Sequence, residues 1–113
     1  MTLYRTSRHS VVDALMWRPM SIQFIWDLED DPDGNYWHIV LEGHGVTQEE
    51  VEEVLLRHDN ETILSRSSGE PITFGWTSSG KYIAVVWEEV QVDPRMIYPV
   101  TAYPVSPPKR KKL

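Results

Sequence analysis

Three polar side chains have the types that RNA cleavage through a 2′-hydroxyl attack requires. His44, Arg66 and Glu70 together supply a base, an acid and a cation for the phosphate. Lys81 and Arg95 are two further cations that could bind RNA. Residues of all these types also occur commonly in exposed turns. No glycine-rich phosphate loop or G-x-S-x-G motif accompanies them, so the residues by themselves do not establish an enzyme.

Two other patterns are similar to metal sites but are incomplete. His38 and His44 are six residues apart, whereas a helical zinc site needs two histidines four residues apart. The acidic turn at residues 29–33 alternates carboxylates like a calcium loop, but Val40 stands where an EF-hand needs a bidentate glutamate. We therefore expect no metal and no cofactor. His44 is then a polar residue that fixes the corner between two helices.

The distribution of charge argues against a nucleic-acid-binding body. The chain has 113 residues, enough for one small domain, and the tail Lys109, Arg110, Lys111 and Lys112 holds 4 of its 11 basic residues. Residues 1–108 therefore carry 7 basic against 17 acidic side chains, a formal net charge of −10 that repels a polyphosphate. If RNA binds, we expect this tail to contribute.

The remaining composition predicts a cytoplasmic protein without membrane contact. The chain has no cysteine, which fits a reducing compartment and excludes thiolate metal sites and disulfides. No apolar run approaches the roughly 20 residues that span a bilayer, and no signal peptide is recognisable at the N-terminus.

The clearest local signals lie between residues 21 and 57. Alternating polar and apolar residues predict a strand over 21–26, and a short helix is expected over 35–41 after the acidic turn. Thr47 and Glu50 have the spacing of a capping box, which predicts a second helix over 47–57. Its apolar positions Val51, Val54 and Leu55 form one stripe that faces a core.

Four strands joined by short turns follow this helix. They are expected over residues 61–66, 72–76, 81–90 and 95–105, with the apolar run of the third strand at the centre of the sheet. Pro99 and Pro104 place the last strand at an edge or at a bulge. The predicted fold class is α+β: an antiparallel sheet with two helices on one face, in the order β-α-α-β-β-β-β. Residues 1–20 are expected to form an arm or a short helix, and residues 106–113 a disordered basic tail.

The stretch from residue 26 to residue 55 resembles the start of the BrnT-type toxins, the RelE-like ribonuclease components of bacterial type II toxin–antitoxin pairs. The resemblance spans about residues 21–105 and rests on short motifs. These are Trp26-Asp27, Asn35, His44-Gly45-Val46, the capped helix to Leu55, Gly69-Glu70, the hairpin at Gly80, the strand Ile83 to Val86, and Val100-Thr101-Ala102-Tyr103 in place of Ile-Ser-Ala-Arg. It implies a RelE-like fold, ribonuclease activity and an antitoxin partner.

Several departures from the family pattern remove positive charge. Gly43 stands where a lysine usually precedes His-Gly, and Tyr103 stands where the family has its last arginine. The arginine expected just after Gly-Glu is missing, because Pro71 follows Glu70. We therefore predict a divergent branch of this family with weakened or lost ribonuclease activity. One alternative is a catalytically silent protein-interaction module, forming a homodimer through the edge strand near residues 95–105. The other alternative is a domain that binds a metal ion or a small ligand.

Overall fold

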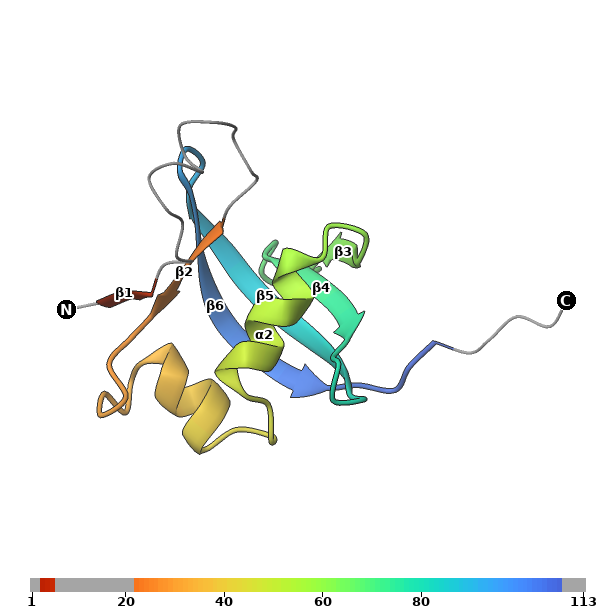
Figure 1. Cartoon of the computed structure of the whole chain (residues 1–113). Coiled ribbons are helices and arrows are strands. Elements are labelled where there is room, and N and C mark those ends of the chain that lie inside the picture. The colour runs from red at the N-terminus through yellow and green to blue at the C-terminus, as the bar shows by residue number, and fades with distance from the viewer. Residues whose placement is uncertain (1–2, 6–21, 109–113) are drawn as a thin grey trace, which may run out of the picture.

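The protein is a mixed β-sheet with its helices packed against it (Figure 1). A computed structural model describes residues 3–5, by their backbone, and residues 22–108. The sheet has six strands in the order β1-β2-β6-β5-β4-β3. Their bounds are β1 Leu3–Arg5, β2 Ile22–Trp26, β3 Glu61–Leu64, β4 Pro71–Trp76, β5 Tyr82–Gln91 and β6 Arg95–Pro104. The α+β class is confirmed, and β1 is a strand that the sequence did not predict.

The sheet is not wholly antiparallel, so that part of the prediction was wrong. β2 pairs with β6 in parallel, with Phe24 opposite Ile97, while all the other neighbouring strands are antiparallel. A parallel pair cannot be closed by a tight hairpin and needs a longer connection that crosses the sheet. Here the chain between β2 and β6 contains both helices and the three strands β3, β4 and β5, which makes parallel pairing possible.

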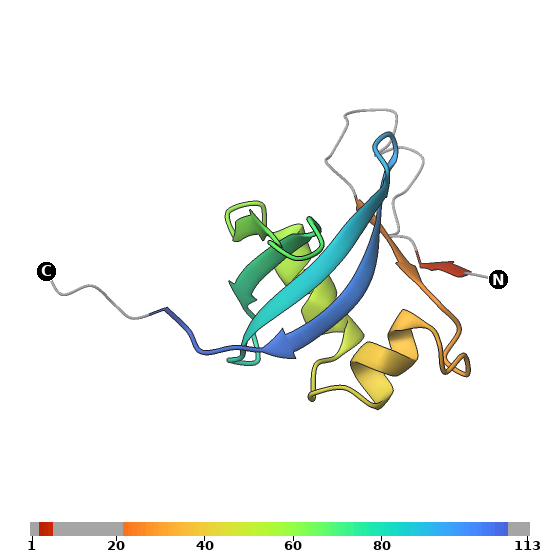
Figure 2. The ribbon, with the colours of Figure 1, turned by 180° about the vertical axis from the view of Figure 1, so that it is seen from behind.

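The two helices cover one face of the sheet. A single π-helical turn, η1, spans Trp37–Leu41, and an α-helix, α2, spans Gln48–Leu56. Thr47 caps α2: its hydroxyl accepts from the Glu50 N–H, and the Glu50 carboxylate accepts from the Thr47 N–H, so the capping box is confirmed. α2 lies in front of β4 and β5 in Figure 1 and behind them in Figure 2, while η1 lies beside β6.

The main core lies between α2 and the sheet. Ile83, Val85 and Trp87 of β5 belong to one buried cluster with residues of both helices and with Phe24 of β2. Ala84, which alternates with them on the other side of β5, is also buried. β5 is therefore an interior strand whose residues 83–87 are buried on both faces, as its nearly continuous apolar run predicts.

β6 is an interior strand with a bulge and not an edge strand. It lies between β2 and β5, and its register against β5 shifts between Val86 and Trp87, where Trp87 faces Pro99. A bulge tolerates a proline because the regular ladder is interrupted there. The edge strands of the sheet are β1 and β3, so the expected edge position was wrong for the start of β6, where residues 95–97 pair with β2. The homodimer through residues 95–105 stays a prediction.

Two expectations concern segments for which the structure gives no description. The arm or short helix over residues 1–20 lies outside the described residues, apart from β1. The basic tail from Lys109 to Lys112 lies outside them as well. In the part of the chain that is described, no helix is long and apolar enough to cross a membrane.

Candidate functional site

The structure does not bring the three expected catalytic residues together. The Lys81 Nζ donates to the Gly45 carbonyl oxygen at 2.6 Å, so the connection that carries His44 lies where β4 ends and β5 begins. Arg66 and Glu70 lie in the β3–β4 turn, at the opposite end of β4. The six residues of β4 span about 20 Å at roughly 3.3 Å per residue. His44 is thus remote from the other two.

The turn that carries Arg66 and Glu70 is closed by local hydrogen bonds. The Ser65 N–H donates to the Glu70 carbonyl oxygen at 2.8 Å, and the Gly69 N–H donates to the Ser65 carbonyl oxygen at 2.8 Å. Gly69 has a φ of 76°, a left-handed conformation that glycine adopts without strain. The Arg66 side chain is exposed. The position of Arg66 is that of a residue in a surface turn, and the described residues around it do not form a phosphate-binding site.

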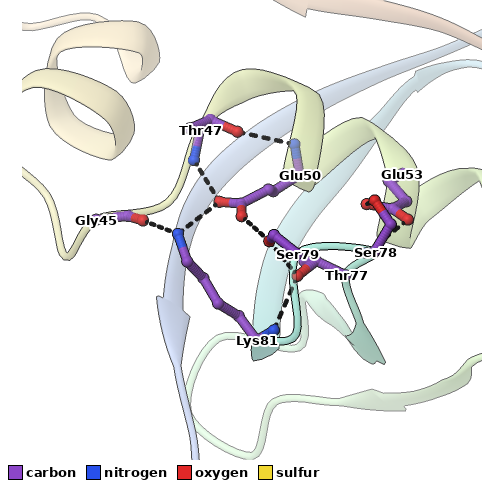
Figure 3. A network of polar contacts seen from close by, with 8 residues as sticks. All are labelled: Gly45, Thr47, Glu50, Glu53, Thr77, Ser78, Ser79 and Lys81. Carbon is purple, nitrogen blue, oxygen red and sulfur yellow. Dashed lines mark hydrogen bonds and ion pairs between the residues drawn. The ribbon is translucent and has the colours of Figure 1, made fainter.

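Lys81, expected to bind RNA, belongs to a polar network that joins α2 to the β4–β5 hairpin (Figure 3). Its Nζ lies 3.1 Å from the Glu50 Oε1, and only 10% of the Glu50 side chain is exposed. The Ser79 hydroxyl donates to the other oxygen of the same carboxylate, and Thr77 bonds to Ser79 at 2.8 Å. A second link joins α2 to the hairpin through Glu53, which accepts from the Ser78 N–H.

The charges within this network compensate one another. Burial raises the pKa of Glu50, but the hydrogen bonds from Ser79 and from the Thr47 N–H, together with the ammonium group of Lys81, lower it below its ordinary value of 4.5 overall. The ionised carboxylate is therefore the stable form. Because Lys81 is paired with this carboxylate, its charge stabilises the contact between α2 and the hairpin, although 40% of its side chain is exposed.

Arg95, the second expected RNA-binding cation in the body, is also paired. Its Nε donates to the Glu89 Oε2 at 2.9 Å, and its guanidinium lies 5.5 Å from the centre of the Trp87 ring. Residues 22–108 contain 16 acidic and 4 basic side chains, a formal net charge of −12. Lys81 and Arg95 are two of these four cations. The described body therefore presents an acidic surface with little free positive charge.

Asn35 holds β2 and β6 together at the point where the two strands diverge. Its side-chain amide donates to the Ile25 carbonyl oxygen at 3.0 Å and to the Pro99 carbonyl oxygen at 2.8 Å. Its Oδ1 accepts from the Asp27 N–H at 2.9 Å, and its own N–H donates to the Asp27 Oδ2 at 3.0 Å. Only 3% of the residue is exposed. Asn35 therefore has a structural role, which the sequence did not reveal because it showed Asn35 only as a motif position. The group of hydrogen bonds that Asn35 makes to Ile25, Asp27 and Pro99 is called the bracket below.

A tyrosine completes this bracket. The Tyr98 hydroxyl donates to the Asp27 Oδ2 at 2.5 Å. Burial and the Asp27 carboxylate raise the pKa of Tyr98 well above its ordinary value. Tyr98 therefore remains a neutral hydrogen-bond donor across the physiological range.

Next to this bracket, η1 presents an imidazole to a hydroxyl group of β6. The His38 Nε2 and the Thr101 Oγ1 lie 3.0 Å apart, and the His38 Nδ1 lies 3.9 Å from the Glu42 carboxylate. The His38 side chain is 55% exposed. An imidazole beside a hydroxyl is an arrangement that a general base can have, but at 3.9 Å the Glu42 carboxylate makes no hydrogen bond that would orient the ring. Sequence reasoning missed this contact because the two residues are 63 positions apart.

The face of the sheet opposite the helices displays aromatic side chains. The rings of Phe74 and Tyr82 stack with centroids 6.5 Å apart, and the Trp76 ring lies 5.1 Å from that of Tyr82. A depression of about 300 Å³ lies beside them. It is lined by Glu61, Ile63, Phe74, Tyr82, Val105, Ser106 and Pro108. These residues come from β3, β4, β5 and the segment after β6, so this face carries a shallow, mainly apolar surface.

The described residues contain no recognisable metal-binding site. Among residues 3–5 and 22–108, no group of three or more His, Asp or Glu side chains is placed to hold a metal ion. In the acidic turn, the side chain of Asp31 accepts from the N–H of Asp33 at 3.0 Å. The turn is thus stabilised by its own carboxylate.

Comparison with known proteins identifies no relative of this chain. No protein-family model, no curated protein and no solved structure matches this chain.

Proposed function

We propose that this chain is a BrnT-like, toxin-related protein with weak or no ribonuclease activity, and that it acts by binding a protein partner. The observation that carries this proposal is the placement of its cations. Lys81 and Arg95 are both paired with carboxylates, while Arg66 and His44 lie near opposite ends of β4, a strand about 20 Å long. The resemblance in sequence supports the family part of the proposal, and the element order from β2 to β6 is compatible with it.

The expected loss of activity follows from the chemistry of phosphate cleavage. The reaction builds negative charge on phosphorus, and removal of one stabilising group from an enzyme costs about 10²–10³ in rate. Gly43 and Tyr103 replace two cations of the family pattern. Three body cations could substitute for them: Lys81 and Arg95 are paired with carboxylates, and Arg66 lies in the β3–β4 turn. Cleavage by the isolated chain should therefore fall near or below detection.

A second candidate function is residual ribonuclease activity centred on His38. The contact between the His38 Nε2 and the Thr101 Oγ1 favours it, because the exposed imidazole could take a proton from a 2′-hydroxyl group. Thr101 and Tyr103 occupy the segment that resembles the Ile-Ser-Ala-Arg end of the family. If His38 is the catalytic base, an antitoxin would neutralise the protein by covering the end of β6.

Expression in bacteria distinguishes the two candidates. Wild type is compared with His38→Ala, His44→Ala, Arg66→Ala and Glu70→Ala, scored for growth and for RNA integrity. His58→Ala is the matched control, because His58 is an exposed histidine in the turn that follows α2. Harmless expression of every version supports the silent module. Growth arrest relieved by His38→Ala alone supports residual activity at η1, whereas relief by His44→Ala, Arg66→Ala or Glu70→Ala restores the site expected from sequence and overturns the proposal.

A further inference from the structure

The strand β3 forms an open, apolar edge of the sheet. It lies at the end of the strand order, and all four of its residues, Glu61–Leu64, are exposed. Ile63 is 45% exposed and Leu64 is 68% exposed. Natural edge strands are usually protected by lysine, proline or inward-pointing charge. β3 is short, with four residues, but it has a single charged residue, at its first position, and no proline. Among the described residues no strand pairs with its outer side, so its outer backbone groups can pair with another strand.

The hydrogen-bond pattern shows which backbone groups face outward. The Ser65 N–H donates to the Glu70 carbonyl oxygen, which makes this a hydrogen-bonded pair of the β3–β4 ladder. Such pairs alternate along antiparallel strands, so Ile63 is hydrogen-bonded to Ile72 as well. The N–H and C=O groups of the intervening residues, Thr62 and Leu64, therefore point away from β4 toward the open edge.

We propose that two copies of this chain associate through β3 as an antiparallel, two-fold symmetric pair with Ile63 on the axis. In this register Thr62 faces Leu64 of the second copy, and Leu64 faces its Thr62. The outward N–H and C=O groups of these residues then form four hydrogen bonds. Ile63 meets its own copy at the close, non-hydrogen-bonded position, and Glu61 faces the polar Ser65. No like charges oppose each other, and no side chain changes face.

A second copy fits this edge because the strand is complementary to itself. A two-fold axis perpendicular to the sheet keeps the helix-free faces of both copies on the same side. Ile63 lines the depression that also contains Phe74 and Tyr82. The pairing would therefore join two such apolar faces into one surface and shield the exposed Ile63 and Leu64.

The charge of the body sets the salt dependence of this association. Each copy carries a formal net charge of −12 over residues 22–108, so the two copies repel each other over a distance that salt shortens. The dimer fraction should rise as sodium chloride increases from about 50 mM to about 500 mM. A contact that depended on a basic partner segment would weaken over the same range.

The test measures mass in solution, by light scattering and sedimentation, over about 1 µM to about 1 mM protein. Ile63→Lys and Ile63→Glu each place like charges on the axis, so either variant alone should be monomeric where wild type is dimeric. An equal mixture of the two should dimerise again, because the axis then joins a lysine to a glutamate. Val92→Lys is the control, since Val92 is an apolar residue that is 75% exposed in the β5–β6 turn; it should dimerise like wild type.

A second variant tests the backbone instead of the side chain. Leu64→Pro removes one outward N–H without removing a bond to β4, and it should abolish dimerisation while the urea midpoint stays that of a folded protein. A wild type that is monomeric at every concentration overturns the inference, as do dimers in both Ile63 variants or a mixture that stays monomeric. These outcomes do not depend on RNA cleavage, so failure here is distinguishable from failure of the proposed function.

Discussion

Replacing Asn35 by alanine should be the most damaging change outside the apolar core. The side chain makes three hydrogen bonds, to the backbone of Ile25, Asp27 and Pro99. At about 1 kcal/mol each, their loss should lower the free energy of unfolding by about 3 kcal/mol. That is a large part of the roughly 5–15 kcal/mol that a domain of this kind has in total. The buried backbone groups left without partners would raise the cost further.

Asn60 provides a matched control for this measurement. Its side-chain amide makes one hydrogen bond, to the Val54 carbonyl oxygen at 2.9 Å, and it is only partly buried. Asn60→Ala should therefore cost about 1 kcal/mol. Both variants are compared with wild type by urea unfolding, followed by tryptophan fluorescence and circular dichroism, at a fixed protein concentration. If Asn35→Ala costs no more than Asn60→Ala, the view that Asn35 holds β2 to β6 is refuted.

Three further perturbations test the hydrogen bonds and the packing around α2. Thr47→Ala should lower the free energy of unfolding by about 1 kcal/mol through the lost N-cap, and an unchanged urea midpoint would contradict the capping geometry. The folded-state pKa of Glu50 lies below 4.5, so the contribution of its carboxylate to stability is complete above that pH and is lost as pH falls through the folded-state pKa. The Glu50→Gln variant should therefore lose less stability than wild type on acidification, and equal losses would refute this. A Cβ at Gly75 would overlap the side-chain amide of Asn60, so Gly75→Ala should cost about 1–3 kcal/mol in thermal unfolding. If this cost is the same in an Asn60→Ala background, the contact is not its cause.

Local signals in the sequence were sufficient to place the elements after residue 21. The capping box of Thr47 fixed the start of α2, and alternation or continuous apolar runs located each strand within a few residues. β3 ends at Leu64, two residues before the predicted end, because the turn from Ser65 begins there. These features depend on neighbours a few positions away, which a single sequence displays directly.

Relations between distant segments could not be obtained in the same way. The parallel pairing of β2 with β6 depends on where the chain arrives after three other strands, and no local pattern records it. The same applies to the contact of His38 with Thr101. The expected grouping of His44 with Arg66 failed because these residues flank opposite ends of β4, and composition does not specify which turns share an end of the sheet.

The interior position of β6 has a consequence for how the protein is made on the ribosome. β2 is synthesised early, but its partner in the sheet is the last strand, and Asn35 bonds to a carbonyl group 64 residues later in the chain. Until β6 has emerged from the exit tunnel, the nascent chain carries one exposed side of β2 and one exposed side of β5. Such distant pairings form slowly because a long loop must first be closed. Slowing translation before β6 has left the tunnel should therefore extend the life of an aggregation-prone intermediate, whereas a delay after β6 has emerged should have no such effect.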